Sequence, residues 1–368
     1  MLRRRMTAER RQGETVKPLE LFFDLVFVLG FTQCTALMVE EHSWQGMARG
    51  MLVLALVWWS WVGYAWLTSV IDPEEGAVRL VVFASMAGLL VTALSIPEAY
   101  GDRAVTFAVA YGAVRVAHIA LYGIASREDP ALRRSVVGLG VGTAVGVAIV
   151  LGGAIFLDGT SQSAVWALAI ALDAAEPAVF GMAGWQLVPR HFAERHNLVI
   201  ILALGESIVV LGVASELDLT ADVIAAAVLG IGLASALWWI YFDVVALVTA
   251  RRLEQAPEGQ EQNVLARDSY SYLHFPMVAG IVLMALGLEA TLAHVGEDLD
   301  AVSATALLGG VALYLLAHVA LRLRNAHTLS RTRSGLAVAL LLLIPAATTV
   351  PALVTVAALN VPLWGMIA

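Results

Sequence analysis

The sequence predicts an all-α, polytopic integral membrane protein, a bundle of about 11 transmembrane helices. Of its 368 residues, 60% are hydrophobic and 14% are charged, whereas about a quarter of the residues in soluble domains are charged. The mean hydropathy is +0.80. Apolar runs of about 18 residues or more recur throughout the chain, and each can cross a hydrocarbon core about 30 Å thick.

Each apolar run defines one expected helix. A basic cytoplasmic segment, 1–18, comes first, and Pro18 suits a helix start because its missing N–H is not needed there. No short apolar stretch with a small-residue cleavage site follows, so no removable signal peptide is expected. The expected helices are 19–39, 45–71, 77–97, 102–125, 134–157, 162–185, 194–215, 221–250, 268–294, 301–324 and 334–359.

The C-terminal part of this transmembrane domain, 19–359, is the least regular. Pro345, Pro351 and Pro362 could break the last helix into a kinked or partly re-entrant piece. Residues 360–368 are expected to form a tail. The polar stretch EQAPEGQEQ within 251–267 predicts a flexible cytoplasmic linker between two helices.

The arginines predict the orientation of the chain in the membrane. With a cytoplasmic N-terminus, arginines gather in alternate loops, and the opposite loops near Leu157, Glu216 and Gly296 contain neither Lys nor Arg. This asymmetry follows the positive-inside rule, and an odd number of crossings then places Ala368 outside. The predicted cytoplasmic arginines are Arg127, Arg133, Arg134, Arg190, Arg195, Arg251, Arg252, Arg267, Arg322, Arg324, Arg331 and Arg333.

Three short matches suggest an internal duplication. AHIAL at 117–121 recurs as AHVAL at 317–321, Trp58-Trp59 matches Trp238-Trp239, and LGFTQ at 29–33 matches LGESI at 204–208. The matched helices have the same orientation, which predicts parallel five-helix repeats, 19–157 and 194–359, with 162–185 as the connecting helix. Chance similarity is the alternative, because alanine-rich helices match one another easily.

The main functional candidate is Glu206, in the stretch from His191 to Gly212. It follows the charged cluster Glu194-Arg195-His196 by about 18 Å of helix, which places it near the middle of a bilayer. A carboxylate at that depth is costly unless it is protonated, paired or hydrated, so we interpret it as a proton- or ion-binding group. The charged cluster would form its entrance. The alternative is a packing role, in which neighbouring small residues permit a close helix contact.

Further ionisable residues lie in the first, fourth and sixth helices. Glu20 belongs to the entrance and suits a solvated position or a helix-dipole contact, whereas Asp24, one turn deeper among phenylalanines, is interpreted as functional. Arg115 requires an anionic partner or a wet cavity. Asp173 and Glu176 cannot both ionise cheaply in one dry site, so one is expected to hold a proton, as in a proton relay. Acids paired structurally to Arg115 are the alternative.

The later helices add two candidates. Asp243 lies in the cytoplasmic third of the eighth helix, and His274 follows two tyrosines at the start of the ninth. Because histidine titrates near neutral pH, His274 is a candidate proton carrier. His118 and His318 have similar predicted depths and are speculative haem ligands. No metal site is predicted, and the single cysteine excludes Cys-based zinc or iron–sulfur sites.

Four segments together resemble the bacterial low temperature requirement protein A (LtrA) family. They are KPLELFFDLVFVLGFTQ from Lys17, HFAERHNLVIILALGESIVVLG from His191, WWIYFD from Trp238 and YLHFPMVAGIVLMALGLE from Tyr272. The resemblance implies a multi-pass bacterial inner-membrane protein but no reaction. It adds weight to Glu20, Asp24, Glu194, Arg195, His196, Glu206, Asp243 and His274.

Three functions remain open. A proton- or ion-coupled transporter or channel explains acids and histidines spread over several helices. A membrane-embedded enzyme acting on a lipid-like substrate would need a compact constellation such as Glu206, His274 and Asp243, and the chain has no HExxH, GxSxG or P-loop motif. A haem protein would use the two histidines named above. The expected partners are the bilayer, an unidentified ion or small molecule and further copies of the chain, but no nucleic acid; the cofactor is unknown.

Overall fold

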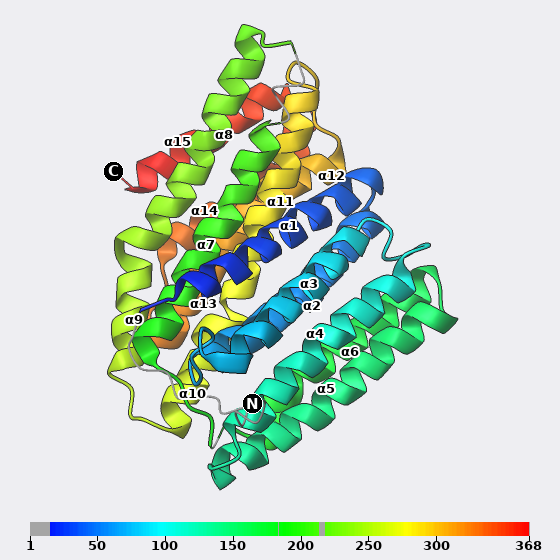
Figure 1. Cartoon of the computed structure of the whole chain (residues 1–368). Helices are drawn as coiled ribbons and strands as arrows, with labels where there is room; N and C mark the ends of the chain where they lie inside the picture. The colour runs from blue at the N-terminus through cyan, green and yellow to red at the C-terminus, as the bar shows by residue number, and fades with distance from the viewer. Residues whose placement is uncertain (1–14, 183, 213–217, 368) are drawn as a thin grey trace. The chain divides into compact units, whose positions relative to one another are not determined.

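The computed structural model describes residues 15–182, 184–212 and 218–367, and these ranges contain helices but no strands. Within them, ten helical segments are long and apolar enough to cross a membrane, which confirms the predicted all-α, multi-span fold (Figure 1). Arg3, Arg4, Arg5, Arg10 and Arg11 of the basic segment lie outside the described residues, as do the loop 213–217 and Ala368.

Seven continuous helices form the first part of the chain. α7 begins at Pro189 rather than at 194, because Pro189 occupies a first helical position. Glu194, Arg195 and His196 therefore lie inside the helix and not before it. The seven helices are α1 (Pro18–Glu40), α2 (Trp44–Thr68), α3 (Gly76–Ser95), α4 (Ala104–Ala125), α5 (Pro130–Phe156), α6 (Gly159–Phe180) and α7 (Pro189–Gly212).

The next three helical segments each contain a π-helical turn, which inserts one extra residue per turn and changes which side chains face inward. The first comprises α8 (Ala221–Ile240), η2 (Tyr241–Val245) and α9 (Ala246–Glu254). The second comprises α10 (Gln260–Ala266), η3 (Arg267–Tyr272) and α11 (His274–Ala293). The third comprises α12 (Ala301–Ala304), η4 (Thr305–Gly309) and α13 (Gly310–Ala326).

The prediction of a flexible linker over 251–267 was wrong. α9 continues to Glu254 and α10 begins at Gln260, so most of this stretch is helical. The buried Asn263 Nδ2 donates hydrogen bonds to the carbonyl oxygens of Met182 at 3.1 Å and Trp185 at 2.7 Å. These bonds fix α10 to the segment that follows α6.

The chain divides into two compact units, each described separately here. Unit 1 comprises the described residues of Met1–Leu37, Ala48–Arg195 and Leu253–Arg267, and unit 2 those of Met38–Met47, His196–Arg252 and Asp268–Ala368. The division inside α7 lies close to 194, where the second predicted repeat begins. The duplication itself stays a prediction.

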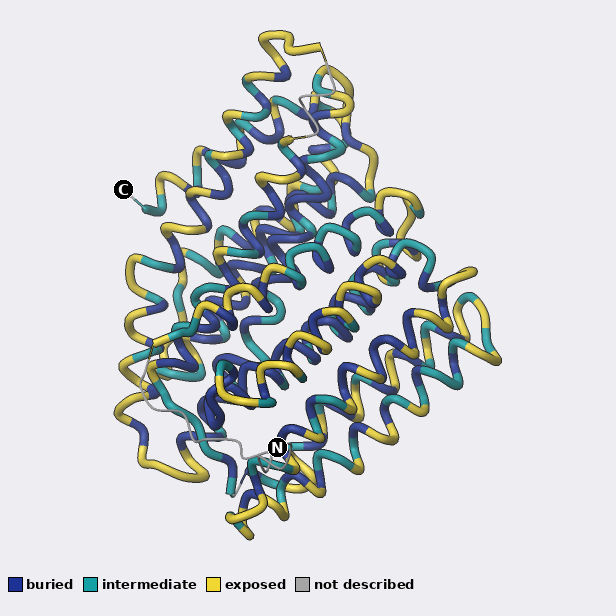
Figure 2. Tube along the Cα trace, in the orientation of Figure 1, coloured by how far each residue is buried: buried dark blue, intermediate teal, exposed yellow. Residues whose placement is uncertain are grey.

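In unit 1, α3 packs on α4, α4 on α5 and α5 on α6, and the four helices lie side by side (Figure 1). Glycines let α5 approach α6 closely: a Cβ atom added to Gly142 would lie 3.1 Å from Glu176 Cγ, and one added to Gly146 would lie 3.2 Å from Asp173 Oδ1. In both α5 and α6, the most apolar stretch is only 22% buried (Figure 2). Their outer faces therefore suit contact with lipid.

In unit 2, the core lies around α11 and α13. A Cβ atom added to Gly280 would lie 2.5 Å from the carbonyl oxygen of Gly310, so the two backbones touch where both residues lack side chains. The most apolar stretches of both helical segments are 72% buried, and the tube is mostly dark blue there (Figure 2). The buried ionisable residues of unit 2 lie on these helices and their neighbours.

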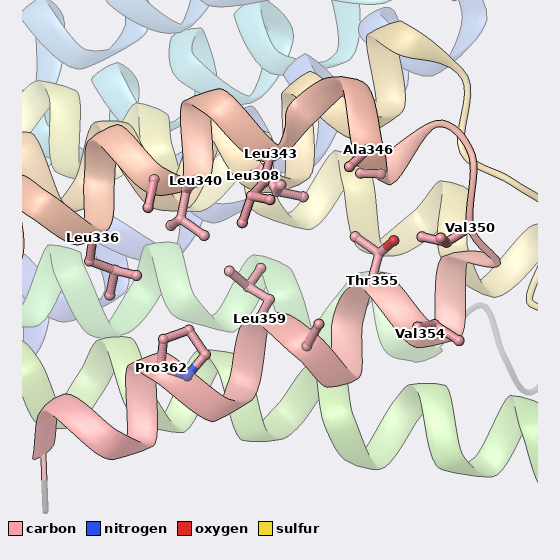
Figure 3. A pocket seen from close by; sticks show the side chains of 13 residues that line it. Leu308, Leu336, Leu340, Leu343, Ala346, Val350, Val354, Thr355, Leu359 and Pro362 are labelled. Atoms are coloured by element: carbon pink, nitrogen blue, oxygen red, sulfur yellow. The ribbon is translucent and has the colours of Figure 1, made fainter.

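The helix predicted over 334–359 is instead two helices, α14 (Arg331–Ala347) and α15 (Ala352–Ile367). They run antiparallel beside an apolar cavity of about 320 Å³ (Figure 3). Pro351 stands just before α15, consistent with the expected break, and 360–367 is helical rather than a tail. The chain turns back at 348–351, so the side of the membrane on which Ala368 lies depends on whether α14 and α15 both cross the membrane. The outside location of Ala368 therefore stays a prediction.

Asp300 offers a stability test at the start of α12. It accepts hydrogen bonds from the backbone N–H groups of Val302 at 2.8 Å and Ser303 at 3.2 Å, and from the His42 ring at 2.9 Å. Partial burial raises its pKa, but the hydrogen bonds from Ser303 and His42 outweigh this and lower the pKa to about 2. Because the folded pKa lies below the unfolded value of about 4, this stabilisation is complete above that value and is lost as pH falls toward 2.

We therefore expect Asp300→Ala to destabilise the protein by about 1 kcal/mol at neutral pH, the usual cost of a lost helix N-cap. The difference in Tm between the natural protein and the variant should shrink as the pH is lowered below about 4. Thermal unfolding in detergent would measure it. Asp102→Ala, at an exposed acid, is the control, and a difference that grows in acid would contradict the prediction.

Candidate functional site

The first cluster of buried charges, the Glu20–Asp24–Arg195 cluster, lies within unit 1. Glu20 and Asp24 are one turn apart on the same face of α1. Arg195 Nη1 donates to Glu20 Oε1 at 3.1 Å, and Arg195 Nη2 donates to Asp24 Oδ1 at 2.6 Å. The three side chains are at most 1% exposed. One guanidinium therefore serves two carboxylates away from water.

Neutral donors complete the cluster. Trp61 Nε1 donates to Asp24 Oδ1 at 2.9 Å, and the Arg195 guanidinium carbon lies 5.7 Å from the centroid of the Trp61 ring. His191 Nε2 donates to Glu20 Oε1 at 2.9 Å, and His191 Nδ1 lies 3.1 Å from Ser69 Oγ. Trp61, His191 and Ser69 were not predicted from the sequence. The spacing of His191 four residues before Arg195 was the available signal, because it places both on one face of α7.

The direction in which the Ser69 hydroxyl donates its hydrogen bond depends on whether His191 Nδ1 carries a proton. Ser69 Oγ also lies 3.1 Å from the Ala65 carbonyl oxygen, and a hydroxyl has only one proton to donate. If Ser69 donates to Ala65, His191 Nδ1 must donate to Ser69 and the imidazole is cationic. If Ser69 donates to His191 Nδ1, the imidazole is neutral. Both forms fit the same heavy-atom positions.

These positions correct the predicted entrance. Glu20 is not solvated, and Arg195 is not a loop residue but an ion-pair partner inside α7. His196, in unit 2, is also fully buried, while Glu194 is half-buried and its Oε2 accepts a bond of 3.2 Å from the Val16 backbone. The physical reason is that α7 begins a turn earlier than predicted.

The second cluster, the Arg115–Asp173–Glu176 cluster, joins α4, α5 and α6 in unit 1. Arg115 Nη2 donates to Asp173 Oδ2 at 2.9 Å and to Thr143 Oγ1 at 3.1 Å. Glu176, three residues after Asp173 on α6, is 6% exposed and lies against Gly142. This ion pair matches the alternative in the sequence analysis, in which the acids are paired structurally to Arg115. It leaves the second carboxylate without a cation of its own inside the cluster.

Unit 2 contains a third network, centred on His274. Its Nδ1 donates to the Ser269 carbonyl oxygen at 2.8 Å, and its Nε2 lies 2.8 Å from the Tyr241 hydroxyl. The same hydroxyl lies 2.8 Å from Asn197 Oδ1. The π turns η2 and η3 supply Tyr241 and Ser269, so two of the irregular turns meet at this network. The His196 and Tyr270 rings lie 5.3 Å and 5.0 Å from the His274 ring.

This network also has two proton arrangements. Tyr241 can donate to Asn197, in which case His274 Nε2 carries a second proton and donates to Tyr241. Alternatively, Tyr241 donates to a neutral His274, and Asn197 turns its amide group so that its NH₂ donates to the Tyr241 oxygen. The protonation state of His274 is therefore coupled through the Tyr241 hydroxyl to the amide of Asn197. A role of His274 as a proton carrier stays a prediction.

We expect Tyr241→Phe to destabilise the protein by about 1–3 kcal/mol, because it leaves buried His274 Nε2 without its bond to Tyr241. The Tm in detergent would measure the effect. Tyr122→Phe is the matched control: the Tyr122 hydroxyl is buried and has no hydrogen-bond partner in the described part of the chain. Equal Tm values for the two variants would contradict this role of Tyr241.

Three predicted residues of unit 2 differ in burial and in hydrogen bonding. Glu206 on α7 is fully buried, as predicted from its position in an apolar run. Both ring nitrogens of His274 are engaged by Tyr241 and Ser269. Asp243, in η2, is exposed, whereas the neighbouring Tyr241 is buried. The constellation of Glu206, His274 and Asp243 that an enzyme would need stays a prediction.

The two speculative haem ligands have different surroundings. In unit 1, His118 Nε2 donates to the Gly63 carbonyl oxygen at 2.9 Å; in unit 2, His318 Nδ1 donates to the Tyr314 carbonyl oxygen at 2.8 Å. Haem ligation stays a prediction. The described residues contain no group of three or more His, Cys, Asp or Glu residues placed to hold a metal ion.

The ring of each histidine also lies near a tyrosine ring on a helical segment that contains one of the two tryptophan pairs. In unit 1, the His118 ring lies 5.3 Å from the Tyr64 ring on α2. In unit 2, the His318 ring lies 6.0 Å from the Tyr241 ring, which follows α8. The internal duplication stays a prediction.

Comparison with known proteins identifies the family. The family described as bacterial low temperature requirement A protein (LtrA) matches residues 15–368. An uncharacterized protein of Rhizobium meliloti (strain 1021) is 30% identical over 311 residues, which cover 80% of this chain and 74% of that protein. No solved structure matches. Because the match extends over nearly the whole chain, this multi-span membrane protein belongs to the LtrA family.

Proposed function

We propose that the protein is a proton- or ion-coupled transporter or channel of the bacterial inner membrane. The observation that carries the proposal is the charge of the two clusters in unit 1. Among the described residues, each cluster joins two carboxylates and one guanidinium, and these three groups together are one positive charge short of neutrality when both acids are ionised. A net charge inside a low-dielectric membrane domain is costly, and a proton or small cation removes it.

The Glu20–Asp24–Arg195 cluster has a built-in acceptor for that proton. Protonation of His191 Nδ1 makes the cluster neutral, and the Ser69 hydroxyl then turns to the Ala65 carbonyl oxygen. Release of the proton reverses this rearrangement without breaking either Arg195 ion pair. Such a site can be loaded and unloaded with little structural cost, as a transport intermediate requires.

In the Arg115–Asp173–Glu176 cluster, Glu176 is the proposed loading site. Asp173 is held by Arg115, whereas Glu176 lies one turn further along α6. A proton or a cation on Glu176 neutralises the cluster. A membrane-embedded enzyme is less well supported, because Asp243 is exposed whereas His274 and Tyr241 are buried.

The test is ion flux into vesicles that contain the purified protein and a pH-sensitive dye. With the membrane potential clamped by potassium and valinomycin, we expect an imposed pH gradient to collapse faster than in protein-free vesicles. We expect Glu176→Gln to slow this flux, because the amide cannot take up a proton. Glu128→Gln, at an exposed loop acid, should leave the flux unchanged.

A sodium gradient in the same vesicles, and a potassium gradient in vesicles without valinomycin, distinguish a proton pathway from a cation-coupled one. A cation-coupled transporter should acidify or alkalinise the interior when the cation gradient alone is imposed. Rates equal to those of protein-free vesicles under all three gradients would contradict the proposal. Unchanged flux in Glu176→Gln would exclude Glu176 as the loading site.

A further inference from the structure

A pocket with an apolar wall and several polar side chains lies in unit 2, where η2 and α9 meet the end of α13 and the start of α14. Its volume is about 420 Å³, within the usual size of small-molecule sites. Arg322, Arg333, Asn325 and Thr328 line it, and His318 lies deeper among its walls. None of these residues belongs to the clusters proposed for proton or ion loading.

The charge of this pocket is positive. Its lining contains two arginines and no carboxylate. Arg322 Nε donates to Thr328 Oγ1 at 2.9 Å, and Arg333 Nη2 lies 3.5 Å from the Ile240 carbonyl oxygen. Neither arginine forms an ion pair with any residue that the structure describes, whereas nearby Arg324 is paired with Asp268 at 3.0 Å. Most of the N–H groups of the two lining arginines therefore remain available to an anion.

His318 supplies a further polar atom. The side chain is fully buried, and Nδ1 donates to the Tyr314 carbonyl oxygen. Its Nε2 is buried and has no hydrogen-bond partner among the described residues. A buried polar atom without a partner is costly unless a ligand or water satisfies it. Nε2 can accept a bond from a protonated oxygen or, once protonated, donate to an anionic one.

Two further features define the ligand. The pocket is lined by the C-terminal end of α13 and the N-terminal end of α14, whose helix dipoles have opposite signs there. The two arginines therefore determine the charge of the pocket. Val244 and Val248 form an apolar wall and are 53% and 48% exposed on the outside of the protein. The two arginines lie at the ends of α13 and α14, on either side of the loop that the positive-inside rule predicts at the cytoplasmic surface. Basic pockets of this kind between membrane helices bind lipid headgroups.

We propose that the pocket formed by Arg322, Arg333 and His318 binds a phosphate-bearing anion. The guanidinium groups bind the phosphate oxygens, for which their planar fork of N–H donors is suited. His318 Nε2 completes the phosphate contacts, and the valines contact the apolar part of the ligand. The two sources of such an anion are the headgroup of an anionic phospholipid and a soluble phosphate compound.

The experiment measures the Tm of the full-length protein in detergent with added phosphatidylglycerol, phosphatidylcholine or inorganic phosphate. We expect phosphatidylglycerol, but not phosphatidylcholine, to raise the Tm in a concentration-dependent way. In Arg322→Gln and Arg333→Gln, the apparent affinity should fall about tenfold or more, because each change removes charge-assisted hydrogen bonds. Arg331→Gln, at an exposed arginine of α14 outside the pocket lining, should match the natural protein.

The outcomes separate the two sources. If inorganic phosphate raises the Tm, phosphatidylglycerol does not, and the shift is lost in Arg322→Gln, the site stands and its ligand is soluble. If neither anion shifts the Tm, or if Arg331→Gln weakens binding as much as Arg322→Gln, the proposal is overturned. Because Arg322 is exposed, its replacement should leave the fold intact. His318→Gln provides a second variant, which should weaken binding of the same anion.

Discussion

Arg195→Met is expected to destabilise the protein by about 3–5 kcal/mol, the usual cost of removing one partner from a buried ion pair. The arginine is fully buried and bonds Glu20 at 3.1 Å and Asp24 at 2.6 Å. Its removal leaves two carboxylates in a dry site, where His191 and Trp61 still donate hydrogen bonds but the positive charge of the guanidinium is lost. Tryptophan fluorescence during thermal unfolding in detergent would measure the loss.

Two further variants distinguish charge from packing. The triple variant Glu20→Gln, Asp24→Asn, Arg195→Met removes all three charges, so it should recover much of the lost stability if uncompensated charge is the cause. Arg134→Gln, at an exposed arginine of α5, should have little effect. A triple variant no more stable than Arg195→Met would show that the arginine acts through its packing and hydrogen bonds instead.

The sequence was sufficient to predict the fold class because a bilayer requires long apolar helices whatever their packing. It could not predict the π turns, since one extra residue in a turn leaves the hydropathy unchanged. The 251–267 stretch was misinterpreted for a similar reason. Its polar composition indicates contact with water, but the hydrogen bonds from Asn263 to Met182 and Trp185 depend on tertiary structure.

The buried charges were predictable one by one, but their partners were not. Asp24 and Arg115 stood out because a charge in an apolar helix needs compensation. His191 and Trp61 did not, because both residue types are common near membrane surfaces. Asp243 was grouped with His274 in the sequence analysis. The helix before Asp243 is apolar on all sides, so its sequence gives no pattern from which to predict the buried face. In the structure, Asp243 lies in η2 and is exposed.

Glu206→Gln tests whether the main sequence candidate acts by taking up a proton or cation. Glu206 and the adjacent Ser207 are both fully buried in α7. Glutamine keeps the shape and hydrogen-bonding capacity of glutamate but cannot titrate. In the vesicle flux assay, we expect the variant to insert and purify normally yet to lose pH-dependent flux, down to the rate of protein-free vesicles.

A packing role for Glu206 predicts the opposite pattern. Flux would then persist in Glu206→Gln, and Glu206→Leu would lower the Tm sharply, because leucine offers nothing to the polar groups around the carboxylate. Glu254→Gln, at an exposed glutamate at the end of α9, controls for a general effect of lost negative charge. Normal pH-dependent flux in Glu206→Gln, in vesicles where the natural protein is active, would exclude Glu206 as the central binding carboxylate. The loading sites proposed in unit 1 would remain open to the Glu176→Gln test, because neither of them includes Glu206.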